Sequence, residues 1–195
     1  MKAYKDFIVS PIGERYNNSK KIGKKELVLN TEIFNHQYVN RLAKVIATPL
    51  LFQSPINVGD EVIVHHNVFR RWHNVKGEEK NSRSYLEENK YLVCEDQIYL
   101  FKNKDWFAMP GFSLVKPIKS NNDFSVEKEN ELMGVVKYSD GFFNKNDLIG
   151  FRPGIKCEDF INGERLYRVS NKFITIKYEH QGNEKEYNPS WTQSG

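Results

Sequence analysis

Three histidines, His65, His66 and His73, are the residues whose type and spacing could most directly do chemistry. Imidazole is a common zinc ligand and can act as a general acid or base near neutral pH. Most zinc sites add cysteine or carboxylate ligands at characteristic spacings, and no such ligand is spaced with these three. We therefore expect no metal, and we interpret the segment around Trp72 as an aromatic and basic loop or interface. An enzyme that uses these histidines would need a pocket that gathers them with an acid.

The two cysteines, Cys94 and Cys157, predict neither a disulfide framework nor a metal pair, because they lie far apart at unrelated positions. Free thiols are typical of a reducing cytosol. The sequence contains no Walker pattern, glycine-rich phosphate loop or paired nucleophile and base. We expect no catalytic residue, no cofactor and no enzymatic activity.

The charge balance is mixed: 29 basic residues face 25 acidic ones, which gives a formal net charge of +4. Such a balance lacks the dense face of one sign that nucleic-acid binding requires. The compact basic cluster consists of Lys20, Lys21, Lys24 and Lys25. A solvated loop explains this cluster more economically than a phosphate site does, and we expect no nucleic-acid partner.

Length and hydropathy predict a folded, soluble chain. The 195 residues suffice for two small domains, and a hydrophobic content of 39% excludes a disordered or fibrous chain. Residues 1–4 contain no apolar signal region, and no apolar run approaches the ~20 residues that span a bilayer. We expect a cytoplasmic protein without a membrane partner.

Three consecutive aliphatic residues, Leu27, Val28 and Leu29, interrupt a polar segment at about 13–35. One interpretation is a short strand tucked into a β-barrel. The other is an apolar hook displayed for a partner. The pattern alone favours the packed strand.

The chain contains an internal duplication. Residues 57–64 match residues 144–151, and Asp147 follows Asp60 by 87 positions. Gly59 and Asn146, one position earlier, both tolerate left-handed backbone. Three further blocks match in the same order: 8–12 with 114–118, 43–46 with 133–136, and 91–101 with 166–176. The offsets of these three blocks, 106, 90 and 75, indicate shorter loops in the second copy.

Short runs of Val, Ile, Tyr and Phe between turns, without a helical period, predict an all-β fold. Expected strands include 40–48 and 62–64, and residues 91–101 are expected to form a closing hairpin. Because small β domains must hide their edge strands, we predict two small, partly open β-barrels in tandem. The expected domains are residues 1–105, with the long loop at about 13–35, and residues 106–178, followed by a polar C-terminal tail at 179–195.

The order of these features resembles the GroES co-chaperonin family, the lids of group I chaperonins. It comprises a strand ending at Pro11, a polar loop with an aliphatic tripeptide, the block 58–64 and the block 91–101. The resemblance extends over residues 4–101 and, more weakly, 112–178. It implies two GroES-like barrels in a homo-oligomeric ring that caps a GroEL-like chaperonin and assists ATP-dependent protein folding. It also implies that the loop is mobile and that Leu27, Val28 and Leu29 dock on the chaperonin, which reverses the preference for a packed strand.

The chain departs from the family pattern in three places. Lys25 and Glu26 replace the glycine pair expected before the tripeptide, and residues 49–55 are too few for the family's roof hairpin. Phage-encoded co-chaperonins also lack that roof, which is consistent with a bacteriophage protein in the host cytoplasm. The second copy has only residues 124–126 as a poor counterpart of the tripeptide. The alternative function is a viral or assembly structural protein that keeps the barrel fold without chaperonin binding.

Overall fold

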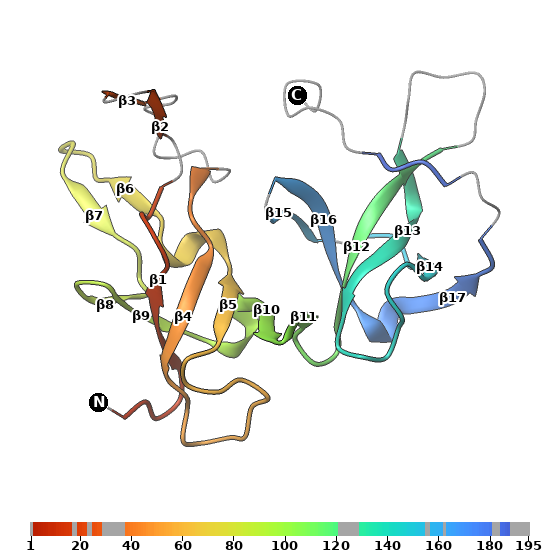
Figure 1. The fold of residues 1–195 in the computed structure, drawn as a ribbon, viewed down its shortest axis with the longest axis horizontal. Coiled ribbons are helices and arrows are strands. Elements are labelled where there is room, and N and C mark those ends of the chain that lie inside the picture. Colours follow the sequence, from red (N-terminus) through yellow and green to blue (C-terminus); the bar gives the residue numbers. More distant parts are fainter. Residues whose placement is uncertain are drawn as a thin grey trace. The chain divides into compact units, whose positions relative to one another are not determined.

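The computed structural model describes residues 2–16, 19–22, 25–28, 38–120, 129–154, 157–161, 163–180 and 184–187. In these ranges the regular structure is β-strand apart from short 3-10 segments, which confirms the all-β fold (Figure 1). The chain divides into two compact units, Met1–Asp105 and Trp106–Gly195. No helix in the described ranges is long and apolar enough to cross a membrane.

The first unit is built on a seven-stranded sheet with the strand order β11-β10-β5-β4-β1-β9-β8. Its strands are β1 (Phe7–Pro11), β4 (Leu42–Ala47), β5 (Glu61–Val64), β8 (Tyr85–Glu87), β9 (Lys90–Val93) and β10 (Ile98–Asn103). The sheet's edge strand β11 (Asp105–Ala108) begins at the last residue of the first unit and continues into the segment assigned to the second. Two hairpins form separate two-stranded sheets: β2 (Ser19–Ile22) with β3 (Lys25–Val28), and β6 (Arg71–His73) with β7 (Glu79–Asn81). The 3-10 helices of this unit are η2 (His66–Val68) and η3 (Glu95–Gln97).

The second unit has a six-stranded sheet with the order β15-β16-β12-β13-β14-β17. Its elements are β12 (Phe112–Lys119), β13 (Glu129–Ser139), β14 (Leu148–Phe151), β15 (Cys157–Ile161), β16 (Glu164–Ser170), η4 (Asn171–Phe173) and β17 (Ile174–Tyr178). Residues 184–187 fall in the expected polar tail, yet they pair with β12. The amide of Lys119 donates to the carbonyl of Lys185 at 2.8 Å, and the amide of Tyr187 donates to that of Pro117 at 2.9 Å.

The two sheets share one strand order, as the predicted internal duplication requires. The run β8-β9-β1-β4-β5-β10 corresponds strand for strand to β15-β16-β12-β13-β14-β17. The register agrees as well, because Val9 pairs with Val45 and Val115 pairs with Val136. A register shift immediately precedes Val9 in β1 and Val115 in β12. Such irregularities tend to be retained as features of a fold, so the copies share details as well as topology.

The turn before the fourth strand of each copy is built in the same way. The carboxylate of Asp60 accepts a hydrogen bond from the amide of Asn57 at 2.8 Å, and Asp147 accepts the equivalent bond from Asn144 at 3.0 Å. The residue before each aspartate has a positive φ, 96° at Gly59 and 73° at Asn146. Asparagine is one of the few residues other than glycine that adopt this conformation readily, so the matched turn motif predicts the observed geometry.

One matched block is shifted by a residue relative to the sequence alignment. Pro11 pairs with Ala43 in the first unit, and Pro117 pairs with Gly134 in the second. The equivalent of Ala43 is therefore Gly134, whereas the sequence match placed Met133 there. A shift of one residue moves a side chain to the opposite face of a strand. Ala43 and Gly134 are both buried, which fits the corrected register.

The last block needs the same correction. Val9 pairs with Tyr91, and Val115 pairs with Tyr167, so Tyr167 rather than Leu166 is the counterpart of Tyr91. The 3-10 helices η3 and η4 follow at matching positions. The pattern of apolar residues was right, but the pairing of individual residues within the block was wrong.

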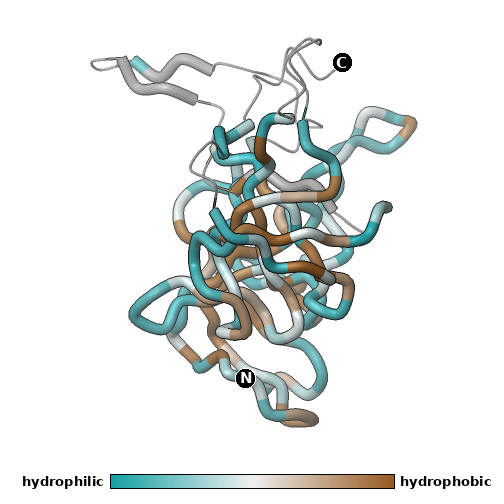
Figure 2. Tube along the Cα trace, turned by 90° about the vertical axis from the view of Figure 1, so that its right-hand side faces the viewer, coloured by the Kyte–Doolittle hydropathy of each residue, from teal (hydrophilic) through white to brown (hydrophobic). Residues whose placement is uncertain are grey.

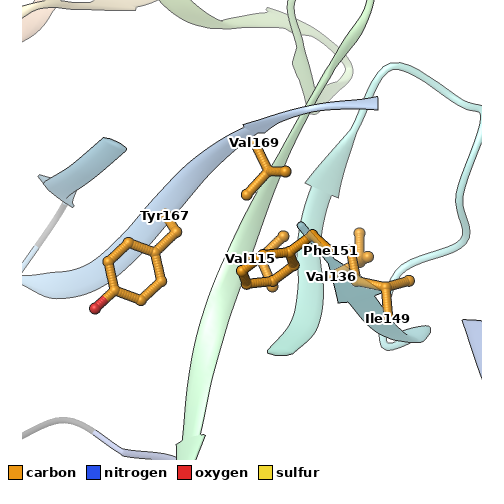
Figure 3. Close-up of a cluster of buried hydrophobic side chains, with 6 residues drawn as sticks. All are labelled: Val115, Val136, Ile149, Phe151, Tyr167 and Val169. Carbon is orange, nitrogen blue, oxygen red and sulfur yellow. The ribbon is translucent and has the colours of Figure 1, made fainter. Parts of the chain in front are cut away.

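The same six positions form a core in both units. In the second unit they are Val115, Val136, Ile149, Phe151, Tyr167 and Val169, which cluster between the strands (Figure 3). Their counterparts in the first unit are all buried as well: Val9, Val45, Val62, Val64, Tyr91 and Val93. Most of the outer loops of the trace are hydrophilic, and hydrophobic stretches lie mainly inside it (Figure 2). Burial of these six positions is the common source of stability of the two units.

The closing hairpin expected over residues 91–101 is wrong. Strands β9 and β10 lie at opposite ends of the run β9-β1-β4-β5-β10, although only Cys94 and the three residues of η3 separate them. Such a short link requires the sheet to curl so that its first and last strands meet at one end. The counterpart strands β16 and β17 are joined by η4 in the same way. Within the described residues, no ladder of hydrogen bonds closes either sheet into a barrel.

Candidate docking site

The longest connection of the first unit leaves the sheet between β1 and β4. Its central residues, 17–38, are called the excursion below. In the second unit, β12 and β13 are joined by residues 120–128 alone. The excursion therefore has no counterpart of similar length in the second unit, which makes it a candidate for a function beyond folding.

A buried asparagine holds the base of the excursion closed. The side-chain amide of Asn40, which is 6% exposed, donates to the carbonyls of Ile12 and Glu14 at 2.8 Å each. The side-chain oxygen of Asn40 accepts a hydrogen bond from the backbone amide of Leu42 at 2.9 Å. The backbone amide of Asn40 donates to the carbonyl of Arg15 at 2.9 Å. One side chain thus joins the chain that enters the excursion to the chain that leaves it.

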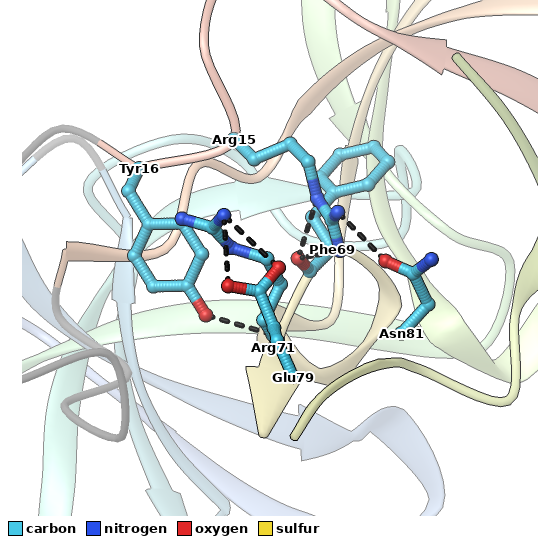
Figure 4. Close-up of polar contacts among 6 residues, drawn as sticks. All are labelled: Arg15, Tyr16, Phe69, Arg71, Glu79 and Asn81. Carbon is cyan, nitrogen blue, oxygen red and sulfur yellow. Dashed lines mark hydrogen bonds and ion pairs between the residues drawn. The ribbon is translucent and has the colours of Figure 1, made fainter. Parts of the chain in front are cut away.

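Arg15 extends this base toward neighbouring strands (Figure 4). Its guanidinium donates to the carbonyl of Phe69 at 3.1 and 2.9 Å and to the side-chain oxygen of Asn81 at 2.8 Å. It also lies over the ring of Tyr91, 5.5 Å from the centroid. Burial raises the pKa of Tyr91 even though the Arg15 charge acts in the opposite direction. The phenol therefore stays neutral, and its role here is to pack.

Tyr16 makes the second link from the base (Figure 4). Its hydroxyl accepts a hydrogen bond from the amide of Arg71 at 2.8 Å, and the Arg71 guanidinium lies 4.8 Å from the centre of its ring. Tyr16 is 7% exposed and forms an isolated β-bridge with Val39. The excursion consequently starts and ends at fixed points on the unit.

The structure places most of the predicted tripeptide on a hairpin within the excursion. Leu27 pairs with Lys20, and Val28 pairs with Ser19, in the two-stranded sheet of β2 and β3. Leu29 lies outside the described residues. The segment at about 13–35 thus contains two strands and is not a continuous loop. In the described part of the chain, β3 pairs with β2 and does not join the seven-stranded sheet.

The basic cluster lies on the same hairpin. Lys20 and Lys21 belong to β2, and Lys25 begins β3 opposite Ile22. Lys24 lies outside the described residues. The described residues of the cluster and of the tripeptide therefore share one small element.

The three histidines do not form a metal centre with other ligands. His65 and His66 stack with their ring centroids 4.1 Å apart, and His65 meets the ring of Tyr99 edge-on. His73 belongs to β6. Among the described residues, no group of three His, Cys, Asp or Glu side chains could hold a metal ion.

The exposed thiol of Cys94 shows no sign of activation. Cys94 is an exposed residue, but partial desolvation of its sulfur and a hydrogen bond with Asp6 raise the pKa of the thiol. Reactive cysteines have lowered pKa values, because the thiolate is the nucleophile. Cys157 is the first residue of β15, and its side chain lies outside the part described.

The second unit has a small cavity of about 250 Å³ beside β12 and β13. Two of the lysines that line it form ion pairs, with Lys116 3.0 Å from Glu186 and Lys137 3.1 Å from Glu164. Burial opposes the charge on Lys116, but Glu186 and Glu164 together raise the pKa of Lys116. The cavity therefore has the character of a structural ion-pair network. The poor tripeptide counterpart at 124–126 lies outside the described residues.

No model of a known protein family matches this chain, and no curated protein sequence matches it significantly. The assignment of a function therefore depends on the geometry of the excursion. The sequence analysis singled out the tripeptide but missed Asn40 and Tyr16, which fix the base of the excursion. The available signal was the position of Asn40, between a long polar segment and a strand.

Proposed function

We propose that this chain is a co-chaperonin that caps a GroEL-like group I chaperonin and assists ATP-dependent protein folding. In this proposal each curled sheet is a GroES-like, partly open barrel, and several chains form a ring. The protein itself performs no chemistry, since ATP hydrolysis belongs to the chaperonin. The excursion docks on the chaperonin through Leu27, Val28 and Leu29.

The observation that carries the proposal is the placement of the tripeptide. Leu27 and Val28 lie on a hairpin that belongs to the excursion, while Asn40 fixes the base of that excursion. A two-stranded hairpin alone is marginally stable, so a partner surface would complete its structure. This arrangement suits an element that is presented to another protein.

The energetics favour a ring of weak contacts. Burial of three aliphatic side chains contributes roughly 5 to 8 kcal/mol to the binding free energy, before the conformational entropy lost on docking is subtracted. Ordering the docking segment consumes much of this free energy, so a single chain should bind weakly. In a ring, the second and later contacts form at high effective concentration, and the assembly binds strongly. Weak individual contacts permit release in each nucleotide cycle.

The alternative is a viral or assembly structural protein without chaperonin binding. That function would be favoured if the tripeptide strand were part of the main sheet. The placement of β3 in a separate two-stranded sheet supports the docking function instead.

The test is co-sedimentation of the purified chain with a group I chaperonin, with and without ATP. A variant in which Leu27, Val28 and Leu29 are changed to Ser should lose nucleotide-dependent binding. The matched control changes Leu50 and Leu51, which are 65% and 54% exposed on the same unit, to Ser and should bind normally. Absence of binding by the unmodified chain, or equal binding by both variants, would overturn the proposal.

A further inference from the structure

A second extension exists only in the first unit. Residues 70–83, called the arm below, contain the hairpin of β6 and β7 and make up most of the connection from β5 to β8. In the second unit, the counterpart strands β14 and β15 are separated by residues 152–156 alone. The arm, like the excursion, was therefore added to or retained on one copy of a duplicated fold.

The arm is internally rigid. At its tip, the side-chain oxygen of Asn74 accepts hydrogen bonds from the amides of Lys76 and Glu78, both at 3.0 Å. Along its strands, Arg71 forms an ion pair with Glu79 at 3.2 Å. These contacts hold the tip in one conformation, which lowers the entropy that binding would remove.

The arm presents two apolar side chains to solvent. Val75 at the tip is fully exposed, at 105% of its reference area, and Trp72 is 47% exposed. The indole nitrogen of Trp72 donates to the carbonyl of Asn81 at 3.2 Å, which fixes the direction of the ring. Val75 contributes nothing to burial within the unit. Aromatic residues held in this way are typical of the anchors that dominate protein interfaces.

The arm and the excursion share their base (Figure 4). The hydroxyl of Tyr16, the residue just before the excursion, accepts a hydrogen bond from the amide of Arg71 in the arm. Arg15 beside it donates to Asn81 in the other strand of the arm. The two extensions are therefore fixed to one framework, and a partner that engages one lies within reach of the other.

Charge supports a common partner for the two extensions. The arm carries five basic and two acidic residues, and the excursion carries four and two, which gives formal charges of +3 and +2. Their sum exceeds the +4 of the whole chain. The excess positive charge of the molecule is thus concentrated on the two extensions. Such a distribution steers association with an acidic surface.

We propose that the arm is a second docking element that inserts Val75 and Trp72 into an apolar, acid-rimmed site on the same chaperonin that takes the excursion. This inference rests on the proposed co-chaperonin function. The aliphatic tripeptide supplies one contact, and the rigid tip of the arm supplies a neighbouring contact. Together they set the orientation of the first unit on its partner.

The test is an equilibrium titration of the chain against a purified group I chaperonin in the presence of ATP. Val75→Ser should weaken binding about tenfold, which corresponds to the loss of one buried valine side chain. The matched control is Val58→Ser, because Val58 is also a turn valine of the first unit and is 63% exposed. Val75→Ser and Val58→Ser should both keep the melting temperature of the unmodified chain.

A charge variant tests the acidic rim. Lys76→Glu should slow association at low ionic strength and should have little effect at high ionic strength. If Val75→Ser binds like the unmodified chain while the tripeptide variant fails to bind, the role of the arm is overturned and the co-chaperonin function stands. If the unmodified chain does not bind, both are overturned. If the arm instead binds a single-stranded RNA oligonucleotide and Lys76→Glu abolishes only that binding, the arm is a nucleic-acid element and the proposal is wrong.

Discussion

Val45 and Val136 occupy the same position in the two units. The carbonyl of Val45 accepts a hydrogen bond from the amide of Gly59 at 2.9 Å, and that of Val136 accepts one from Asn146 at 2.8 Å. The amides of Val45 and Val136 also donate, at 2.9 Å each, to the backbone carbonyls of Asp60 and Asp147. Both valines are buried in the core of their unit. The two copies therefore share individual hydrogen bonds as well as strand order.

One such difference predicts a stability effect at Gly134. A β-carbon at this position would lie 2.4 Å from Cγ1 of Val115 and 2.6 Å from the carbonyl oxygen of Lys116. The backbone would have to move, so Gly134→Ala should lower the free energy of unfolding by about 1 to 3 kcal/mol. The measurement is chemical denaturation. An unchanged midpoint would show that β12 and β13 do not approach as closely as described.

The hydrogen bonds of the buried Asn40 side chain predict that Asn40→Ala loosens the base of the excursion. The carbonyls of Ile12 and Glu14 would lose their donor, and each unsatisfied group costs about 1 to 3 kcal/mol where it stays buried. Because Ile12 and Glu14 are exposed residues and water can reach part of this base, we expect a loss of about 1 to 3 kcal/mol in the free energy of unfolding and faster amide exchange over residues 12–16 and 39–42. Asn67→Ala, at an exposed position, is the control. Equal effects of the two substitutions would contradict the role of Asn40 in holding the base of the excursion closed.

The turn at Asp147 predicts a pH-dependent contribution to stability. Burial opposes ionisation, but hydrogen bonds from Lys177 and from the amide of Asn144 outweigh it and hold the pKa of Asp147 below its ordinary value. Lys177 lies 2.8 Å from the carboxylate. A carboxyl with a lowered folded-state pKa contributes stability above its ordinary pKa and loses this contribution as the pH falls through the lowered value.

Asp147→Asn should therefore lower the free energy of unfolding by roughly 1 kcal/mol at pH 7, and the difference should shrink as the pH falls below about 4. Asparagine can still accept the hydrogen bond from Asn144, so the turn itself should persist. Lys177→Met removes the same ion pair, so its loss of unfolding free energy relative to the unmodified chain should also shrink as the pH falls below about 4. A difference that is the same at pH 3 and pH 7 would refute the ion-pair contribution.

The sequence predicted the repeated turn because its chemistry is local. Asp60 and Asp147 each cap their own turn, and the residue before each aspartate tolerates a positive φ. The all-β fold and the duplicated strands followed from short apolar runs between such turns. These features need no knowledge of distant contacts.

Pairing of individual residues was harder to predict, because neighbouring apolar residues are interchangeable by type. Met133 and Gly134 differ by one position in a strand, and only the ladder to Pro117 decides which of them matches Ala43. The mistaken hairpin of β9 and β10 has a similar cause. Closeness in sequence favoured pairing, whereas the sheet separates these strands by three others.

The candidate site was predictable in part. The tripeptide stands out as an aliphatic run in a polar segment, but the residues that fix the base of the excursion lie in separate parts of the sequence. Tyr16 and Arg71, for example, are 55 positions apart. The arm was anticipated as an aromatic and basic segment around Trp72. Its hairpin form depends on the local turn at Asn74 and Gly77, where Gly77 has a φ of 78°.

Amide hydrogen exchange of the chain alone and bound to a group I chaperonin with ATP would test the central claim most directly. Docking through the excursion and the arm predicts slower exchange in β2, β3, β6 and β7 in the complex, with no change in the buried strand β14 of the second unit. Bound chain with unchanged exchange in these four strands, or with protection confined to the second unit, would contradict this account.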